Sequence, residues 1–144
     1  MKDLLTSVKA QLKTDLTYVR DGDIFVTEDE NMIPDHVKFP AVGLKDGNID
    51  YEIETSDQET DTLYITIIAY VELRKPEAAI MGDAATGKKG VLDIVVDIKA
   101  ALNNERFSGV YESAIPVSSA ASGLLVDEKT AIQKKSITMK YTKT

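Results

Sequence analysis

The stretch at residues 62–73, TLYITIIAYVEL, constrains the fold more than any other part of the chain. It is rich in Ile, Tyr, Thr and Val and contains neither Gly nor Pro, which is typical of a β-strand. Side chains alternate across a strand, so its two faces can be separated. One face is uniformly apolar (Leu63, Ile65, Ile67, Ala69, Val71 and Leu73), whereas the other is mixed (Thr62, Tyr64, Thr66, Ile68, Tyr70 and Glu72). The pattern predicts a central strand with helices over the apolar face, and a long hairpin arm is the alternative.

Two segments have the apolar periodicity of helices that can cover this face. In residues 3–16 the apolar positions form a single stripe: Leu4, Leu5, Val8, Leu12 and Leu16. In residues 91–104 they form a broader face: Val91, Ile94, Val95, Ile98, Ala101 and Leu102. Asp93 and Asp97 lie one turn apart on the opposite side, where we expect solvated carboxylates and no cation site.

Further strand signals flank the central stretch. We predict a short strand at 24–26, a hairpin of 39–45 and 49–54 that turns at Asp46–Gly47, and two last strands at 110–117 and 131–141. In the last strand Ile137, Met139 and Tyr141 alternate with polar residues, giving one core face and one wet face. The element order predicts a two-layer α+β domain: a mixed or antiparallel β-sheet with two helices packed on one face.

Composition limits the function classes. A chain of 144 residues fits a single domain, here taken as 1–144. No apolar run is long enough for a spanning helix, and the N-terminus lacks the apolar core of a signal peptide, so no membrane role is expected. The absence of cysteine excludes disulfides, thiol nucleophiles and Cys-ligated metals. A net charge of -7 argues against binding nucleic acid through its phosphates.

The acidic segment 27–38, TEDENMIPDHVK, contains carboxylates that could in principle bind a metal. Glu28, Asp29 and Glu30 are consecutive, which does not match the alternating ligands of a calcium loop. His36, the only histidine, has no Ser, Cys or paired carboxylate in a recognisable catalytic pattern. We therefore expect a solvated loop with no metal and no catalytic residue.

The segment Gly82–Lys89, GDAATGKK, nearly fits the phosphate-binding loop G-x-x-x-x-G-K-[ST]. Lys89 replaces the magnesium-binding Ser or Thr, and the preceding strand does not run directly into Gly82. A mobile loop with a positive end is the better interpretation, and a nucleotide-binding enzyme remains a remote alternative. With no other catalytic or cofactor signature, the residues alone indicate an acidic α+β domain that is not an enzyme and has no cofactor.

The order of segments resembles a tailed-bacteriophage tail-terminator protein of the lambda protein-U type, over nearly the whole chain. The matching words are LTYVR (16–20), IFVTE (24–28), FPAVGLKDG (39–47), EAAIMGD (77–83), GVLDI (90–94) and IQKK (132–135). The resemblance implies an α+β subunit of a hexameric ring in the virion, assembled in the host bacterial cytoplasm. Such a ring caps the head-proximal end of the tail tube, stops tube growth and joins the head.

The implied partners are other copies of the chain, the tube protein, a neck or head-completion protein and, in a contractile tail, the sheath. DNA would pass through the ring without specific binding, because an acidic subunit repels the DNA phosphates. The expected contact residues lie in two long loops (Glu28, Asp29, Glu30 and His36; Arg74, Lys75, Lys88 and Lys89). Tyr64, Ile68 and Tyr70 form either a subunit contact or a second core layer. A neck or head-completion connector is the alternative function.

Overall fold

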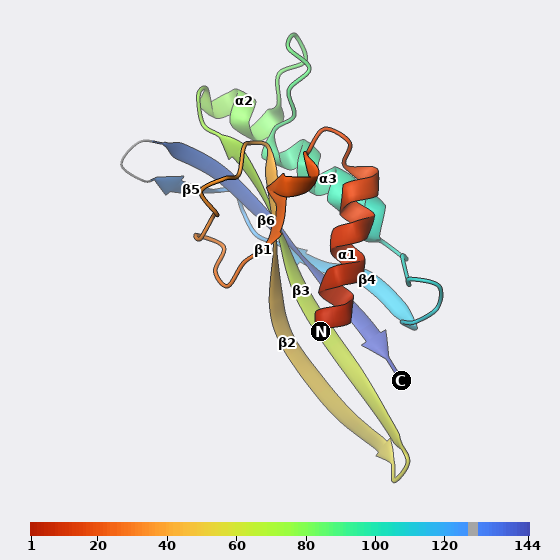
Figure 1. Ribbon diagram of the computed structural model, residues 1–144. Helices are drawn as coiled ribbons and strands as arrows, with labels where there is room; N and C mark the ends of the chain where they lie inside the picture. Colours follow the sequence, from red (N-terminus) through yellow and green to blue (C-terminus); the bar gives the residue numbers. More distant parts are fainter. Residues whose placement is uncertain (127–129) are drawn as a thin grey trace.

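A computed structural model describes residues 1–126 and 130–144 of the chain. These described residues form three helices, one short 3-10 turn and six strands, arranged as in Figure 1. The helices are α1 (Lys2–Asp15), α2 (Pro76–Met81) and α3 (Val91–Leu102). The strands are β1 (Ile24–Val26), β2 (Ala41–Thr55), β3 (Gln58–Glu72), β4 (Ser113–Ser119), β5 (Gly123–Val126) and β6 (Ala131–Lys143).

The strands form one open sheet in the order β1-β2-β3-β6-β4, and β5 also pairs with β6. β1 runs parallel to β2, whereas the other pairings are antiparallel, so the sheet is mixed. β3 lies between β2 and β6 and pairs with β6 from Asp61 to Glu72. The predicted α+β class and the central position of the 62–73 stretch are confirmed.

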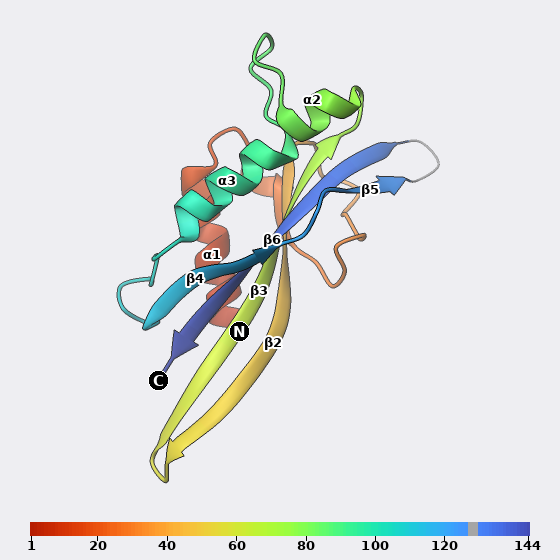
Figure 2. The same cartoon turned by 180° about the vertical axis from the view of Figure 1, so that it is seen from behind.

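α1 and α3 cover one face of this sheet, as Figures 1 and 2 show from opposite sides. The predicted stripe of α1 is buried at Leu4, Val8 and Leu12. The main core lies between these helices and the apolar faces of β3 and β6, including Ile65, Ile67 and Met139. Burial of these apolar side chains is the main force that holds the two layers together.

The opposite face of the sheet carries a second, smaller core (Phe25, Val37, Ala41, Ile68, Tyr70 and Ile132). The segment 27–40 folds over it, and Ile33 and Phe39 pack against it from above. Ile68 and Tyr70 are fully buried there, so the expectation that they form a subunit contact is wrong and the second core layer is correct. The segment 27–38 likewise packs over this second core and is not simply a solvated loop.

The hairpin differs most from prediction. β2 is continuous through Asp46–Gly47, where the register with β3 shifts as in a β-bulge, and the chain turns only after Thr55. Gly47 is required by close approach, because a Cβ there would lie 2.7 Å from the carbonyl oxygen of Tyr64. The Asp46–Gly47 pair was predicted to be a turn because glycine is common both in tight turns and in β-bulges. The predicted strands 39–45 and 49–54 are thus one strand.

Other boundaries shift by a few residues. α3 ends at Leu102, β4 begins at Ser113 instead of Val110, and β5 was not predicted as a strand. β5 shares the outer edge of β6 with β4, so its short sequence is stabilised by pairing and not by propensity. The core and wet faces of β6 are as predicted, with Ile137, Met139 and Tyr141 buried.

Candidate functional site

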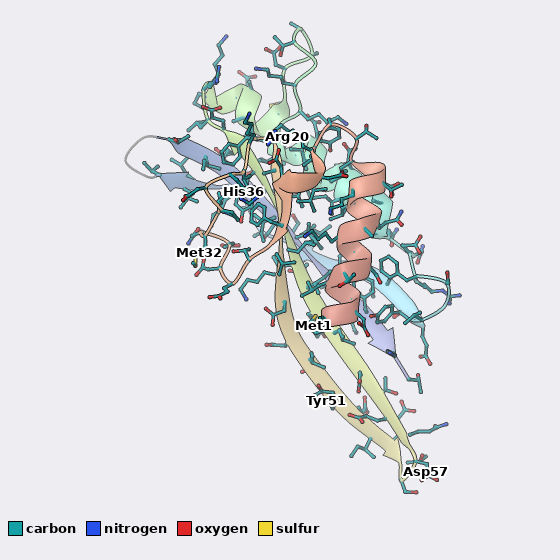
Figure 3. All side chains as sticks on the ribbon, viewed as in Figure 1. Met1, Arg20, Met32, His36, Tyr51 and Asp57 are labelled. Carbon is teal, nitrogen blue, oxygen red and sulfur yellow. The ribbon has the colours of Figure 1, made fainter. Side chains whose placement is uncertain are left out.

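Two of the most exposed apolar side chains of the sheet, Tyr51 and Ile53, lie on the outer end of the β2–β3 hairpin. We call residues 50–60 the distal arm, because there β2 and β3 pair only with each other, beyond the last β3–β6 pair at Asp61. Every residue from 50 to 59 is exposed. Figure 3 shows Tyr51 and Asp57 on this arm, well away from the helices. The arm thus projects into solvent with two free edges.

Tyr51 and Ile53 are 63% and 77% exposed, respectively. They are two residues apart on one strand, so they point to the same face of the arm. In the sequence, Ile49, Tyr51 and Ile53 alternate with polar residues, which predicts a half-buried strand with one covered face. That expectation is wrong for the isolated subunit: nothing within the described residues covers these side chains.

The distal arm is strongly acidic. It contains Asp50, Glu52, Glu54, Asp57 and Glu59 and no Lys or Arg. These five carboxylates equal five of the seven net negative charges of the chain, so the remainder has a net charge of only -2 (-7 + 5). The negative charge is therefore concentrated on one projection. These acidic neighbours were the signal in the sequence that could have placed Tyr51 and Ile53 in solvent.

A second surface feature lies where β3, α2 and the segment 82–90 meet. It is an open hollow of about 550 Å³, which we call the basic hollow. Its apolar lining includes Tyr18, Phe39, Pro40, Val71, Ala78 and Ala79. Its rim carries Arg74, Lys75, Lys88 and Lys89, with Glu72 and Asp83 as the acidic lining residues. The structure thus brings four of the sequence-predicted contact residues together.

Lys89, one of the four basic rim residues, is held in place by a short polar network. Lys89 Nζ lies 2.6 Å from Asp97 Oδ2 and 4.6 Å from the centre of the Tyr18 ring. The Tyr18 hydroxyl donates a 2.7 Å hydrogen bond to the same carboxylate oxygen. Burial, together with the nearby Asp97 carboxylate, raises the pKa of Tyr18 well above its ordinary value. Asp97 therefore has a protein cation beside it, whereas we had expected it to be solvated.

The backbone of the segment 82–90 differs from that of a phosphate-binding loop. β3 ends at Glu72 and α2 follows before Gly82, so no strand runs directly into the first glycine. Asp83 and Lys88 exchange two backbone hydrogen bonds of 2.8 and 3.1 Å, which fold the loop on itself. The amide of Gly90, at the start of α3, donates to Asp93 Oδ2 at 3.0 Å. The amides of Asp83, Lys88 and Gly90 therefore already donate within the chain, whereas a phosphate-binding loop leaves such amides free for the phosphate.

The acidic segment 27–38 is tied to the sheet by its middle. The Tyr70 hydroxyl donates to the Glu30 carbonyl oxygen at 2.6 Å, and Lys134 Nζ lies 3.0 Å from the Glu30 carboxylate. Glu28 and Asp29 remain exposed. His36 is exposed too, with Nε2 3.3 Å from the Gly22 carbonyl oxygen. These residues cover the second core, and only their outer atoms offer a surface.

Tyr64, the last predicted contact residue, is half-buried on β3 beside the bulge at Gly47.

Within residues 1–126 and 130–144, no three His, Cys, Asp or Glu side chains gather closely enough to hold a metal ion. No helix in that part of the chain has the length and apolar character to cross a bilayer.

A scan against protein-family models finds no match for this chain, and a search of curated proteins finds no similar sequence.

Proposed function

We propose that this protein is a structural virion protein whose copies form a ring on the head-proximal end of a phage tail tube. The ring, hexameric by resemblance, would end tube polymerisation and offer the head or neck a joining surface. The observation that carries the proposal is the distal arm, an exposed projection whose apolar side chains are not covered by any described part of the chain. Exposed apolar groups on a projecting element are typical of protein–protein contacts.

The rest of the molecule suits an assembly role. The two candidate contact loops lie at the surface, one over the second core and one at the rim of the basic hollow. One face of the sheet is packed under the helices and part of the other face is packed under the segment 27–40, which gives the arm a rigid base. A rigid subunit with a projecting arm can bind a neighbour with little loss of conformational entropy.

The charge distribution agrees with a ring that DNA passes through. The net charge of -7 disfavours phosphate contacts, and the distal arm concentrates this charge on one projection. If the basic hollow is covered by protein in the assembled ring, its lysines are removed from DNA. The proposal therefore needs no nucleic-acid-binding surface and no reacting group.

The experiment is to mix the purified protein with the tube protein of the same phage or prophage and to measure tube lengths by electron microscopy. We expect rings at one end of the tubes and shorter tubes as more protein is added. An unrelated acidic protein of similar size serves as the control. Tubes that grow unchanged and bear no ring contradict the proposal. Binding to portal-side proteins but not to tubes would point to a neck or head-completion connector.

A further inference from the structure

The distal arm has two properties that a partner must match. Tyr51 and Ile53 need an apolar surface, because their exposure to water is unfavourable. The five carboxylates around them need positive charge, because bringing them against a neutral or acidic surface would remove their water without compensation. A suitable partner site is therefore a concave apolar surface with basic groups at its edge.

The basic hollow of the same chain has both of these properties. Its floor includes Phe39, Pro40 and Ala78, and its rim carries four basic side chains. Lys75 and Lys88 make no ion pair among the described residues, so their charge is available to a partner. Counting Glu72 and Asp83, the lining has a net charge of +2 (4 - 2).

An arm cannot reach the hollow of its own subunit. Figures 1 and 2 show the tip of the hairpin and α2 at opposite ends of the molecule. Any contact between the two surfaces is therefore intermolecular. A contact between different surfaces of identical chains repeats from copy to copy, and it closes into a ring when the rotation allows or forms a filament when it does not.

We propose that the distal arm of one copy binds in the basic hollow of the next copy, with Tyr51 and Ile53 on the apolar floor and the arm carboxylates beside Lys75 and Lys88. This contact rests on the ring assembly of the proposed function and supplies its head-to-tail interface. Two arms would not pair with each other, because both carry five negative charges and no positive charge. The neighbouring copy is thus the occupant that the charges favour.

Disulfide trapping tests the contact directly, because the natural chain has no cysteine. The double variant Ile53→Cys/Ala78→Cys is oxidised and run on a non-reducing gel. We expect a ladder of covalent oligomers. The matched control is Ile53→Cys/Val96→Cys, in which the second position is 65% exposed on α3 and does not line the hollow. A ladder in the control as strong as in the test variant overturns the proposal, and so does the absence of a ladder in the test variant.

Mixing two defective variants provides the second test. Tyr51→Ser/Ile53→Ser removes the apolar tip, and Lys75→Glu/Lys88→Glu reverses the rim charge. Each change is on the surface, so circular dichroism should show both variants folded. We expect each variant alone to lose self-association by roughly tenfold or more, whereas the mixture forms a one-to-one heterodimer through its single intact contact. A mixture that remains monomeric while the natural chain assembles overturns the proposal.

The outcomes separate this contact from the proposed function. A ladder that stops at a defined size supports both the contact and a ring. A ladder that continues without limit supports the contact but contradicts a ring. Rings of natural chain that form with no trapped ladder leave the proposed function standing and overturn the contact. Cross-linking of Ile53→Cys alone into dimers would show arm–arm pairing, which also overturns it.

Discussion

The inner and outer halves of the β2–β3 hairpin have similar sequence patterns and opposite environments. In the inner half, Ile65 and Ile67 are completely buried under the helices and Ile68 and Tyr70 are buried under the segment 27–40. In the outer half, Ile53 on the adjoining strand is 77% exposed. The alternation is the same, but only the inner half has layers above and below it.

This difference shows that alternation records which side chains share a face and not whether that face is covered. Coverage depends on α1, α3 and the segment 27–40, none of which extends as far as the distal arm. The arm therefore has the alternating pattern of a half-buried strand, although none of these elements packs against it.

The largest effect should come from truncating the same residue type in the two halves. Ile67→Ala leaves a cavity in the main core and should lower the free energy of unfolding by about 2–5 kcal/mol. Ile53→Ala removes a solvent-exposed side chain and should change it by less than about 0.5 kcal/mol. Urea denaturation at low protein concentration measures both. Equal losses would mean that the distal arm is packed in the folded monomer.

The next effect concerns Asp23, which holds the segment 27–40 in place through the amide of Lys38. Arg20 donates hydrogen bonds of 2.7 and 3.0 Å to this buried carboxylate, and the Lys38 amide donates another at 3.0 Å. Asp23→Asn should cost roughly 1.5–3 kcal/mol, as for lost bonds to a charged group. The neighbouring exposed Asp21→Asn serves as the control and should be near neutral.

The Asp23 effect should also depend on pH. The hydrogen bond from Arg20 lowers the pKa of Asp23 below its ordinary 3.8, and this outweighs the opposing effect of burial. A lowered folded-state pKa means that the stabilisation is complete above pH 3.8 and is lost as the pH falls below it. The difference in stability between the natural chain and Asp23→Asn should therefore shrink in acid. A difference independent of pH would show that the charge of Asp23 is not involved.

Gly47 tests the bulge that joins the two halves. An added Cβ would lie 2.7 Å from the Tyr64 carbonyl oxygen, so Gly47→Ala should force the strands apart and cost about 1–3 kcal/mol. A Cβ at Gly22 would meet nothing within 4 Å, so Gly22→Ala is the matched control. Thermal unfolding compares them. A fully stable Gly47→Ala variant would contradict the close approach of the strands.

The smallest effect distinguishes two buried tyrosines. The Tyr70 hydroxyl donates to the Glu30 carbonyl oxygen, whereas the Tyr141 hydroxyl has no hydrogen-bond partner among the described residues. Tyr70→Phe should lower the free energy of unfolding by about 1 kcal/mol, and Tyr141→Phe should leave it unchanged or raise it. Denaturation curves of the two variants are the measurement. The reverse order would show that the hydrogen bond from Tyr70 to Glu30 does not stabilise the segment 27–40 on the sheet.

Much of the fold was predictable because it depends on local periodicity. The helical stripes that begin at Leu4 and Val91 and the two-faced strand ending at Tyr141 each bury the apolar side that the sequence indicates. The bulge at Gly47 was not predictable, since a glycine needed for close contact looks the same in sequence as a glycine needed for a turn. The basic hollow was not predictable either, because it joins residues as far apart as Tyr18 and Lys89.

The sequence by itself determined which side chains share a face, the two-layer α+β class and the excess of acidic groups. Periodicity and composition are local properties, and they survive without knowledge of what packs against what. Only the tertiary structure decided which faces are covered, because coverage depends on elements distant in the chain. It placed Ile68 and Tyr70 in a core, left Tyr51 and Ile53 in water, and set an acidic arm and a basic hollow at opposite ends of one subunit.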